Sequence, residues 1–155
     1  MIDEFNRKCG EILRMALHVE TTLDFFLANY FCFPQNYRTF ILQDEFVDMN
    51  FERKIQIFNK ICEREKIDKK RVEAMNKTVR FVKDIRNRVA HGEAFQFSQK
   101  EEPVIQKRKS LIFKKDELKL TDELIKEVDE KRLFSIQEIV KLHIELSEKL
   151  KRQNL

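Results

Sequence analysis

Residues that break helices or form tight turns are rare in this sequence. Only two glycines and two prolines occur among 155 residues, whereas ordinary proteins contain roughly 12% of the two together. An all-β sandwich or barrel needs many more turns than four such residues supply, so these architectures are excluded. Glycine-rich phosphate-binding loops are excluded too, because the only glycines are Gly10 and Gly92.

Long apolar runs are also missing. The longest, such as residues 25–28, fall far short of the roughly 20 residues that a membrane-spanning helix needs. The acidic N-terminus, residues 1–4, lacks the basic and apolar regions of a signal peptide. We therefore expect a cytoplasmic protein that has no membrane as a partner.

Metal-binding patterns are absent from the sequence. The three cysteines are widely spaced, without a Cys-x-x-Cys pair, and they form no recognised zinc spacing with the three histidines. No cluster of carboxylates has the spacing that would hold magnesium. We expect free or buried thiols in a reducing compartment, and neither a metal nor another cofactor. The residues concerned are Cys9, Cys32, Cys62, His18, His91 and His143.

The residues that are abundant suit amphipathic helices. Hydrophobic residues make up 42% of the chain and charged residues 37%, which is enough apolar material for a core in one domain over residues 1–155. The 31 basic and 27 acidic side chains leave a net charge of +4. This mild excess permits binding to nucleic acid but does not argue for it strongly.

Apolar residues recur at three- and four-residue steps along most of the chain, which predicts helices. In the first predicted helix the buried stripe includes Ile12, Leu13 and Ala16, and in the longest central one it includes Val82 and Ile85. The predicted helical segments cover about 2–31, 36–42, a stretch capped by Asn50, a stretch from Asp68 to about His91, a stretch that starts at Thr121, and about 135–151. Gly92 stands where a helix commonly ends in the left-handed conformation.

Residues 93–120 have a different character. Residues 94–97 alternate between apolar and polar, residues 111–113 are β-prone, and a polar stretch over 98–103 lies between them. We expect an irregular or β-hairpin-like insertion there. The fold class is therefore all-α: an antiparallel bundle of four or five helices with a short insertion before the last helices.

One stretch concentrates polar groups at the expected end of a helix. It brings two guanidinium groups, an amide and an imidazole together, from Arg86, Asn87, Arg88 and His91. Asn87 and His91 share a helix face, but Arg86 and His91 are about 140° apart around an ideal helix. Arg86 and His91 meet only if the helix end unwinds or a second subunit completes the site. Such a helix end is also good capping chemistry without any function.

The run from Arg86 to His91 resembles the R-N-x-x-A-H form of the R-x(4–6)-H motif of HEPN domains. These are all-helical domains found in prokaryotic RNase toxins and abortive-infection proteins, among others. The order of the helices is similar as well, since the motif lies near the end of the third main helix and before a C-terminal helix. The insertion over about 93–120 matches no pattern of the family and leaves the subfamily open.

The resemblance implies a metal-independent endoribonuclease that works as a homodimer, with two motifs facing one composite cleft. His91 would be the acid or base that handles the ribose 2′-hydroxyl or the leaving 5′-oxygen, and Arg86 would stabilise charge on the phosphate. Asn87 would orient His91 or the phosphate. Attack by the 2′-oxygen would leave a 2′,3′-cyclic phosphate. The protein would be a toxin or effector of bacterial defence or of a toxin–antitoxin system, with RNA and an antitoxin protein as partners.

Several residues keep two interpretations. Arg88 could contact RNA phosphate or be a solvated charge at a helix end, and Glu20 and Asp24 could reach the Arg86 region or be surface carboxylates. His18 fits a helix-face pair with Arg14 better than a catalytic role. His143 lies in the apolar stripe of the last helix, which is more typical of a core or boundary position. Two basic runs, 107–109 and 114–115, could follow RNA or lie in a solvated loop.

Two other functions stay open. The chain could be a non-catalytic HEPN-like helical dimer that binds nucleic acid or a partner protein and regulates it. It could also be a helical transcriptional regulator, although no short glycine-bearing turn joins two short helices as in a helix-turn-helix. The presence of both Arg86 and His91 favours the enzyme, because a scaffold needs neither.

Overall fold

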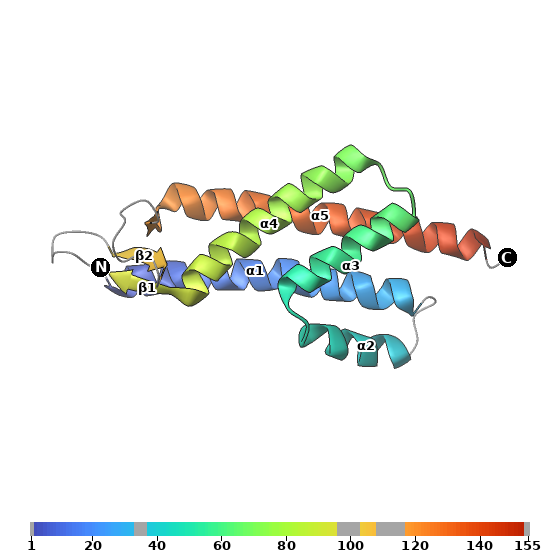
Figure 1. Ribbon diagram of the computed structural model, residues 1–155, viewed down its shortest axis with the longest axis horizontal. Coiled ribbons are helices and arrows are strands. Elements are labelled where there is room, and N and C mark those ends of the chain that lie inside the picture. Colours follow the sequence, from blue (N-terminus) through green and yellow to red (C-terminus); the bar gives the residue numbers. More distant parts are fainter. Residues whose placement is uncertain (1, 33–36, 96–102, 108–116, 154–155) are drawn as a thin grey trace.

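The computed structural model describes residues 2–32, 37–95, 103–107 and 117–153, and these form five helices and three short strands (Figure 1). The all-α bundle with a short strand-containing insertion is thus confirmed. None of the helices described is both long and apolar enough to cross a lipid bilayer. The elements are α1 (Ile2–Phe31), α2 (Tyr37–Val47), α3 (Phe51–Arg64), α4 (Lys69–His91), β1 (Gly92–Phe95), β2 (Val104–Lys107), β3 (Leu118–Lys119) and α5 (Asp122–Gln153).

Consecutive helices run in opposite directions, so the odd-numbered helices all point the same way. The contacts between α1 and α5 show this directly. They pair Lys8 with Asp122 near both helix starts, and the rings of Phe25 and His143 near both ends. Figure 1 shows α3 and α4 crossing α1 and α5, with α2 at one edge beside α1.

A single apolar core joins the helices. In α4 the predicted stripe is confirmed, because Met75, Val79, Val82 and Ile85 are buried, and Val89 packs against the core from the next turn. Ile85 and Val89 thus pack the end of α4 against the core, and the polar residues after Ile85 project from this packed helix.

Local signals at the helix starts are confirmed. The Asn50 side chain accepts a 2.8 Å hydrogen bond from the Arg53 backbone N–H, and Asp68 does the same for Arg71. Thr121 accepts a 3.2 Å bond from the Leu124 N–H at the start of α5. A polar side chain of this kind satisfies an amide that has no partner within the helix.

The expected stop at Gly92 is wrong in its geometry. Gly92 has φ −82° and ψ 158°, which is extended rather than left-handed, and its N–H bonds to the Arg88 carbonyl. The chain therefore passes straight from α4 into β1. His91 is the last helical residue and stands at this junction.

The final two helical segments are in fact one. The expected separate stretches, one starting at Thr121 and one over 135–151, are joined in the 32-residue helix α5. No glycine or proline interrupts residues 122–153, and buried positions continue through the join with Val128, Ser135 and Ile139. Helical periodicity without a breaker keeps one helix continuous.

The insertion forms a small antiparallel sheet in the order β1-β2-β3. Gly92 pairs with Lys107 and Phe95 with Val104, and Ile105 pairs with Leu118. Ile105 and Leu118 are buried in the main core. The sheet closes the end of the bundle at which α4 ends. The β-prone residues 111–113 and the basic residues 108, 109, 114 and 115 lie outside the described part of the chain.

Candidate functional site

The start of α3 determines which part of α1 is covered. Glu20 and Asp24 of α1 lie beneath α3 and bind its Lys54. Leu13 and Leu17 continue the same side of α1 by two turns and one turn, respectively, toward its N-terminus, beyond the point where α3 begins. They are 38% and 58% exposed. The prediction that Leu13 belongs to the buried stripe is therefore wrong.

The same boundary leaves the end of α4 uncovered. Lys83 binds Glu52, in the first turn of α3. The next residues on that side of α4 extend past α3 toward β1, and they include the three motif residues predicted to be catalytic. We call the residues left uncovered on these two helices the open face. They are Leu13 and Leu17 of α1 and Arg86, Asn87, Ala90 and His91 of α4.

Within the open face, Arg86 and Asn87 touch. Arg86 Nη1 donates a 3.0 Å hydrogen bond to Asn87 Oδ1, and both side chains are half-buried. This contact fixes the guanidinium and leaves the Asn87 amide nitrogen as a donor for another acceptor. His91 is exposed one turn further on, about 40° around the helix from Asn87. Asn87 therefore stands between the cation and the imidazole.

One chain does not bring Arg86 and His91 together. The helix stays regular through His91, so the two side chains keep the separation of about 140° that an ideal helix gives. Unwinding of the helix end, one of the two routes expected to join them, does not occur. The route that remains is a second subunit.

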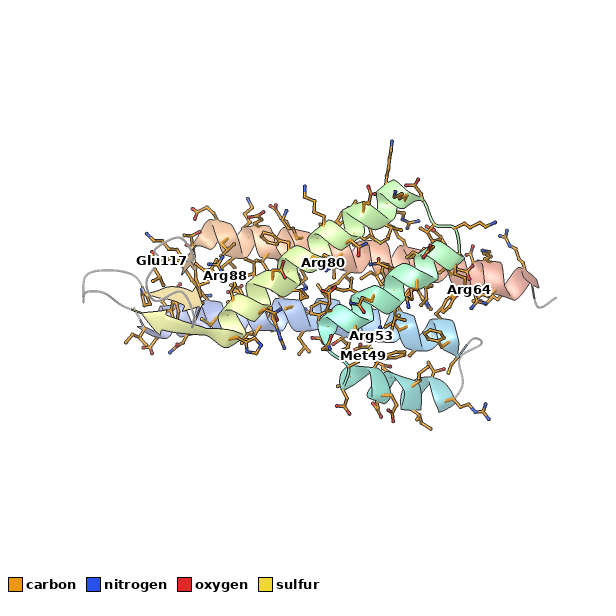
Figure 2. The ribbon with its side chains drawn as sticks, viewed as in Figure 1. Met49, Arg53, Arg64, Arg80, Arg88 and Glu117 are labelled. Atoms are coloured by element: carbon orange, nitrogen blue, oxygen red, sulfur yellow. The ribbon has the colours of Figure 1, made fainter. Side chains whose placement is uncertain are left out.

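Arg88 is half-buried and lies about 60° around α4 from His91, on the side away from Asn87. Figure 2 shows it near the end of α4, close to the sheet. A contact between Arg88 and RNA phosphate stays a prediction.

Glu20 and Asp24 belong to an ion cluster with Lys54. The Lys54 side chain is 1% exposed, and its Nζ lies 2.9 Å from Glu20 Oε1 and 2.9 Å from Asp24 Oδ1. Burial raises the pKa of Asp24, against the opposing effect of the Lys54 ammonium. These carboxylates hold α1 against α3 as partners of Lys54. The interpretation of Asp24 as a surface carboxylate is wrong, because its side chain is buried.

A second ion cluster joins α3 to α4. Glu52 Oε1 lies 2.8 Å from Arg80 Nη1, while Lys83 Nζ binds Glu52 Oε2. These contacts, led by the hydrogen bond from Lys83, lower the pKa of Glu52. The cluster lies one turn before Arg86.

The other histidines are engaged elsewhere. His18 is exposed, and its Nδ1 lies 3.2 Å from Arg132 Nη1 of α5. The His143 ring meets the edge of Phe25 at 5.2 Å between centroids, and burial lowers its pKa. The boundary position expected for His143 is confirmed.

The three cysteines are free thiols: Cys62 is buried, and burial raises its pKa to about 12. Among the described residues, no three His, Cys, Asp or Glu side chains gather closely enough to hold a metal ion.

Sequence reasoning missed Lys54 and the exposed leucines. Lys54 has a detectable signal, because it falls between Phe51 and Ile55 on the apolar face of α3, where a charge must find a partner. The exposure of Leu17 has no such local signal, since it depends on where α3 begins.

A scan against protein-family models and searches of curated proteins and solved structures found no match to this chain.

Proposed function

We propose that this protein is a metal-independent endoribonuclease of the HEPN type, which cleaves RNA by attack of the 2′-hydroxyl on the adjacent phosphate. The observation that carries the proposal is the arrangement of Arg86, Asn87 and His91 on the open face, with Arg86 held by Asn87 at 3.0 Å. The guanidinium and the amide nitrogen offer donors for phosphate oxygens, and the exposed imidazole at the end of the same helix offers a group that transfers protons.

The chemistry follows from these residues. His91 takes the proton of the 2′-hydroxyl or gives one to the leaving 5′-oxygen, and Arg86 stabilises the negative charge that grows on the phosphate. The 2′-oxygen is part of the substrate, so catalysis needs chiefly that the strand be held in line for attack. The products are a 2′,3′-cyclic phosphate and a 5′-hydroxyl.

Two copies of the chain complete the site. Leu13 and Leu17 expose apolar surface on the part of α1 that α3 leaves uncovered, and such surface favours association. A two-fold axis through the open face brings a second Arg86 and a second His91 to the same cleft. An Arg86 of one subunit then acts with His91 of the other, which removes the difficulty of their separation around one helix. A role as a defence toxin with an antitoxin partner belongs to the same proposal.

Removal of divalent metal should leave cleavage intact. We expect the purified protein to cut single-stranded RNA in excess EDTA at the same rate as without it, and the new 3′ ends to resist ligation until the cyclic phosphate is removed to leave a 3′-hydroxyl. Gel analysis of end-labelled RNA measures both properties. Strict dependence on magnesium or manganese would instead require a carboxylate-bound metal and would contradict the proposed mechanism.

Substitution of an open-face leucine should separate the subunits. We expect light scattering to give twice the 18.8 kDa chain mass for the wild type, and the monomer mass together with loss of cleavage for Leu17→Asp, because a buried unpaired charge opposes association. Ile144→Asp is the matched control, since Ile144 is 52% exposed on α5. It should stay dimeric and active.

Mixing two inactive variants tests whether the subunits share a site. A heterodimer of Arg86→Ala and His91→Ala chains keeps one Arg86 and one His91 on different subunits. We expect partial activity to return on mixing, measured against each variant alone. A monomeric wild type that still cleaves RNA would refute the composite site.

A further inference from the structure

Two cations lie on α4 ahead of the catalytic residues. Arg80 is exposed over 42% of its side chain, whereas Lys83 is mostly covered. Both bind one carboxylate, Glu52 of α3: Arg80 Nη1 lies 2.8 Å from Oε1 and 3.0 Å from Oε2, and Lys83 Nζ binds Oε2. Figure 2 shows Arg80 about midway along α4.

These cations share one side of α4 with the proposed site. Steps of three and four residues lead from Arg80 to Lys83, then to Asn87 and His91, which places the four in one row. At 1.5 Å per residue, Lys83 lies about 12 Å along the helix from His91. A strand whose scissile phosphate is at His91 and that follows this row passes Lys83 and Arg80 with a phosphate further along the strand.

The contacts of Glu52 match those of a bound phosphate. Both carboxylate oxygens are engaged, and Oε2 is shared by the two cations, as an oxygen of a phosphate can be in charge-assisted binding. Its side chain is 36% exposed, so an anion from solvent can reach the same cations. Asp84 lies 3.5 Å from Lys83 Nζ but is 67% exposed. Without the Glu52 charge, this solvated acid would be left beside Lys83.

We infer that Arg80 and Lys83 form a second phosphate-binding subsite for the RNA strand, and that Glu52 occupies it in the free protein as an internal competitor. This inference rests on the proposed function, because it takes the strand cleaved at His91 as the ligand. RNA that binds must displace Glu52, so Glu52 weakens binding while Arg80 and Lys83 strengthen it.

The test measures RNA binding apart from cleavage. In a His91→Ala background, the affinity for a single-stranded RNA oligonucleotide is measured by fluorescence anisotropy at several salt concentrations. Glu52→Gln is compared with Glu63→Gln, a variant at an exposed position later in α3. The two variants change net charge equally, so a general electrostatic effect raises both affinities alike.

We expect Glu52→Gln to bind RNA several-fold more tightly than Glu63→Gln, with a steeper salt dependence. One added phosphate contact to a single strand steepens the slope of log K against log salt by about 0.7. Adding Arg80→Ala to Glu52→Gln should abolish the gain. Equal affinities for the two glutamine variants would overturn the inference.

Two further outcomes keep the test decisive. If circular dichroism shows that Glu52→Gln is unfolded, Arg80→Ala alone is compared with Arg64→Ala, whose side chain is 78% exposed. Weaker RNA binding by Arg80→Ala supports the subsite, and equal binding refutes it. If the His91→Ala parent does not bind RNA at low salt, the proposed function fails as well, which distinguishes the two failures.

Discussion

Replacement of His91 by alanine should reduce RNA cleavage by roughly 100- to 10,000-fold, the range for loss of one group that transfers protons. His91 is exposed at the last position of α4 and takes no part in the core, so the fold should survive. The measurement is the initial rate of oligonucleotide cleavage in EDTA, with far-ultraviolet circular dichroism to verify the helices.

His18→Ala is the matched control for this experiment. His18 is exposed as well, but it lies on α1 beside Arg132 and away from the open face. We expect it to cleave at the wild-type rate. Arg86→Ala should lose nearly as much activity as His91→Ala. Equal rates for the wild type and His91→Ala would remove His91 from the reaction and leave a non-catalytic helical dimer as the better description.

Removal of the buried ammonium at Lys54 should destabilise the protein by about 3–5 kcal/mol, the usual cost of breaking a buried ion pair from one side. In Lys54→Met, Glu20 and Asp24 lose the cation that Nζ provides at 2.9 Å from each. The loss is a large part of an ordinary stability of about 5–15 kcal/mol. Urea unfolding measures it, with Lys60→Met, at an exposed position of α3, as the control.

The pH dependence of Lys54→Met has a defined sign. Burial already raises the pKa of Asp24 in the wild type, and removal of the ammonium raises it further. A carboxyl whose pKa is higher in the folded state than in the unfolded state binds its proton more tightly when folded. Its unfavourable contribution therefore appears as pH rises above the unfolded value of about 3.9.

The stability gap between Lys54→Met and the wild type should accordingly narrow when the pH is lowered from about 7 to about 5. Urea unfolding at both pH values measures the gap. A gap that is constant over this range would mean that the cost of the substitution comes from packing around the lysine stem rather than from the unpaired carboxylates.

Features encoded by neighbouring residues could be predicted from the sequence. The start of α4 follows from Asp68 and its buried stripe from the spacing of Val79, Val82 and Ile85, because each signal acts within one or two turns. The residues of the candidate site came from a short motif, whose spacing also showed that Arg86 and His91 diverge on one helix. The open face around that motif could not be predicted in this way.

Features that depend on distant elements were missed for a physical reason. Leu13 has the spacing of a core residue, but whether it is buried depends on where α3 begins across the bundle. Lys54 is accommodated in the interior because Glu20 and Asp24 meet it from a helix about 30 residues earlier in the chain. Glu52 likewise meets Arg80 and Lys83 from a different helix.

The parallel packing of α1 and α5 has a consequence for how the chain folds. The 90 residues from 32 to 121 lie between these two helices, yet α1 lies against α5 from the pair of Lys8 and Asp122 to the pair of Phe25 and His143. Closing so long a loop costs entropy before its contacts form, which slows folding. During synthesis on a ribosome, the side of α1 that packs against α5 therefore stays exposed to solvent and to chaperones until α5 emerges.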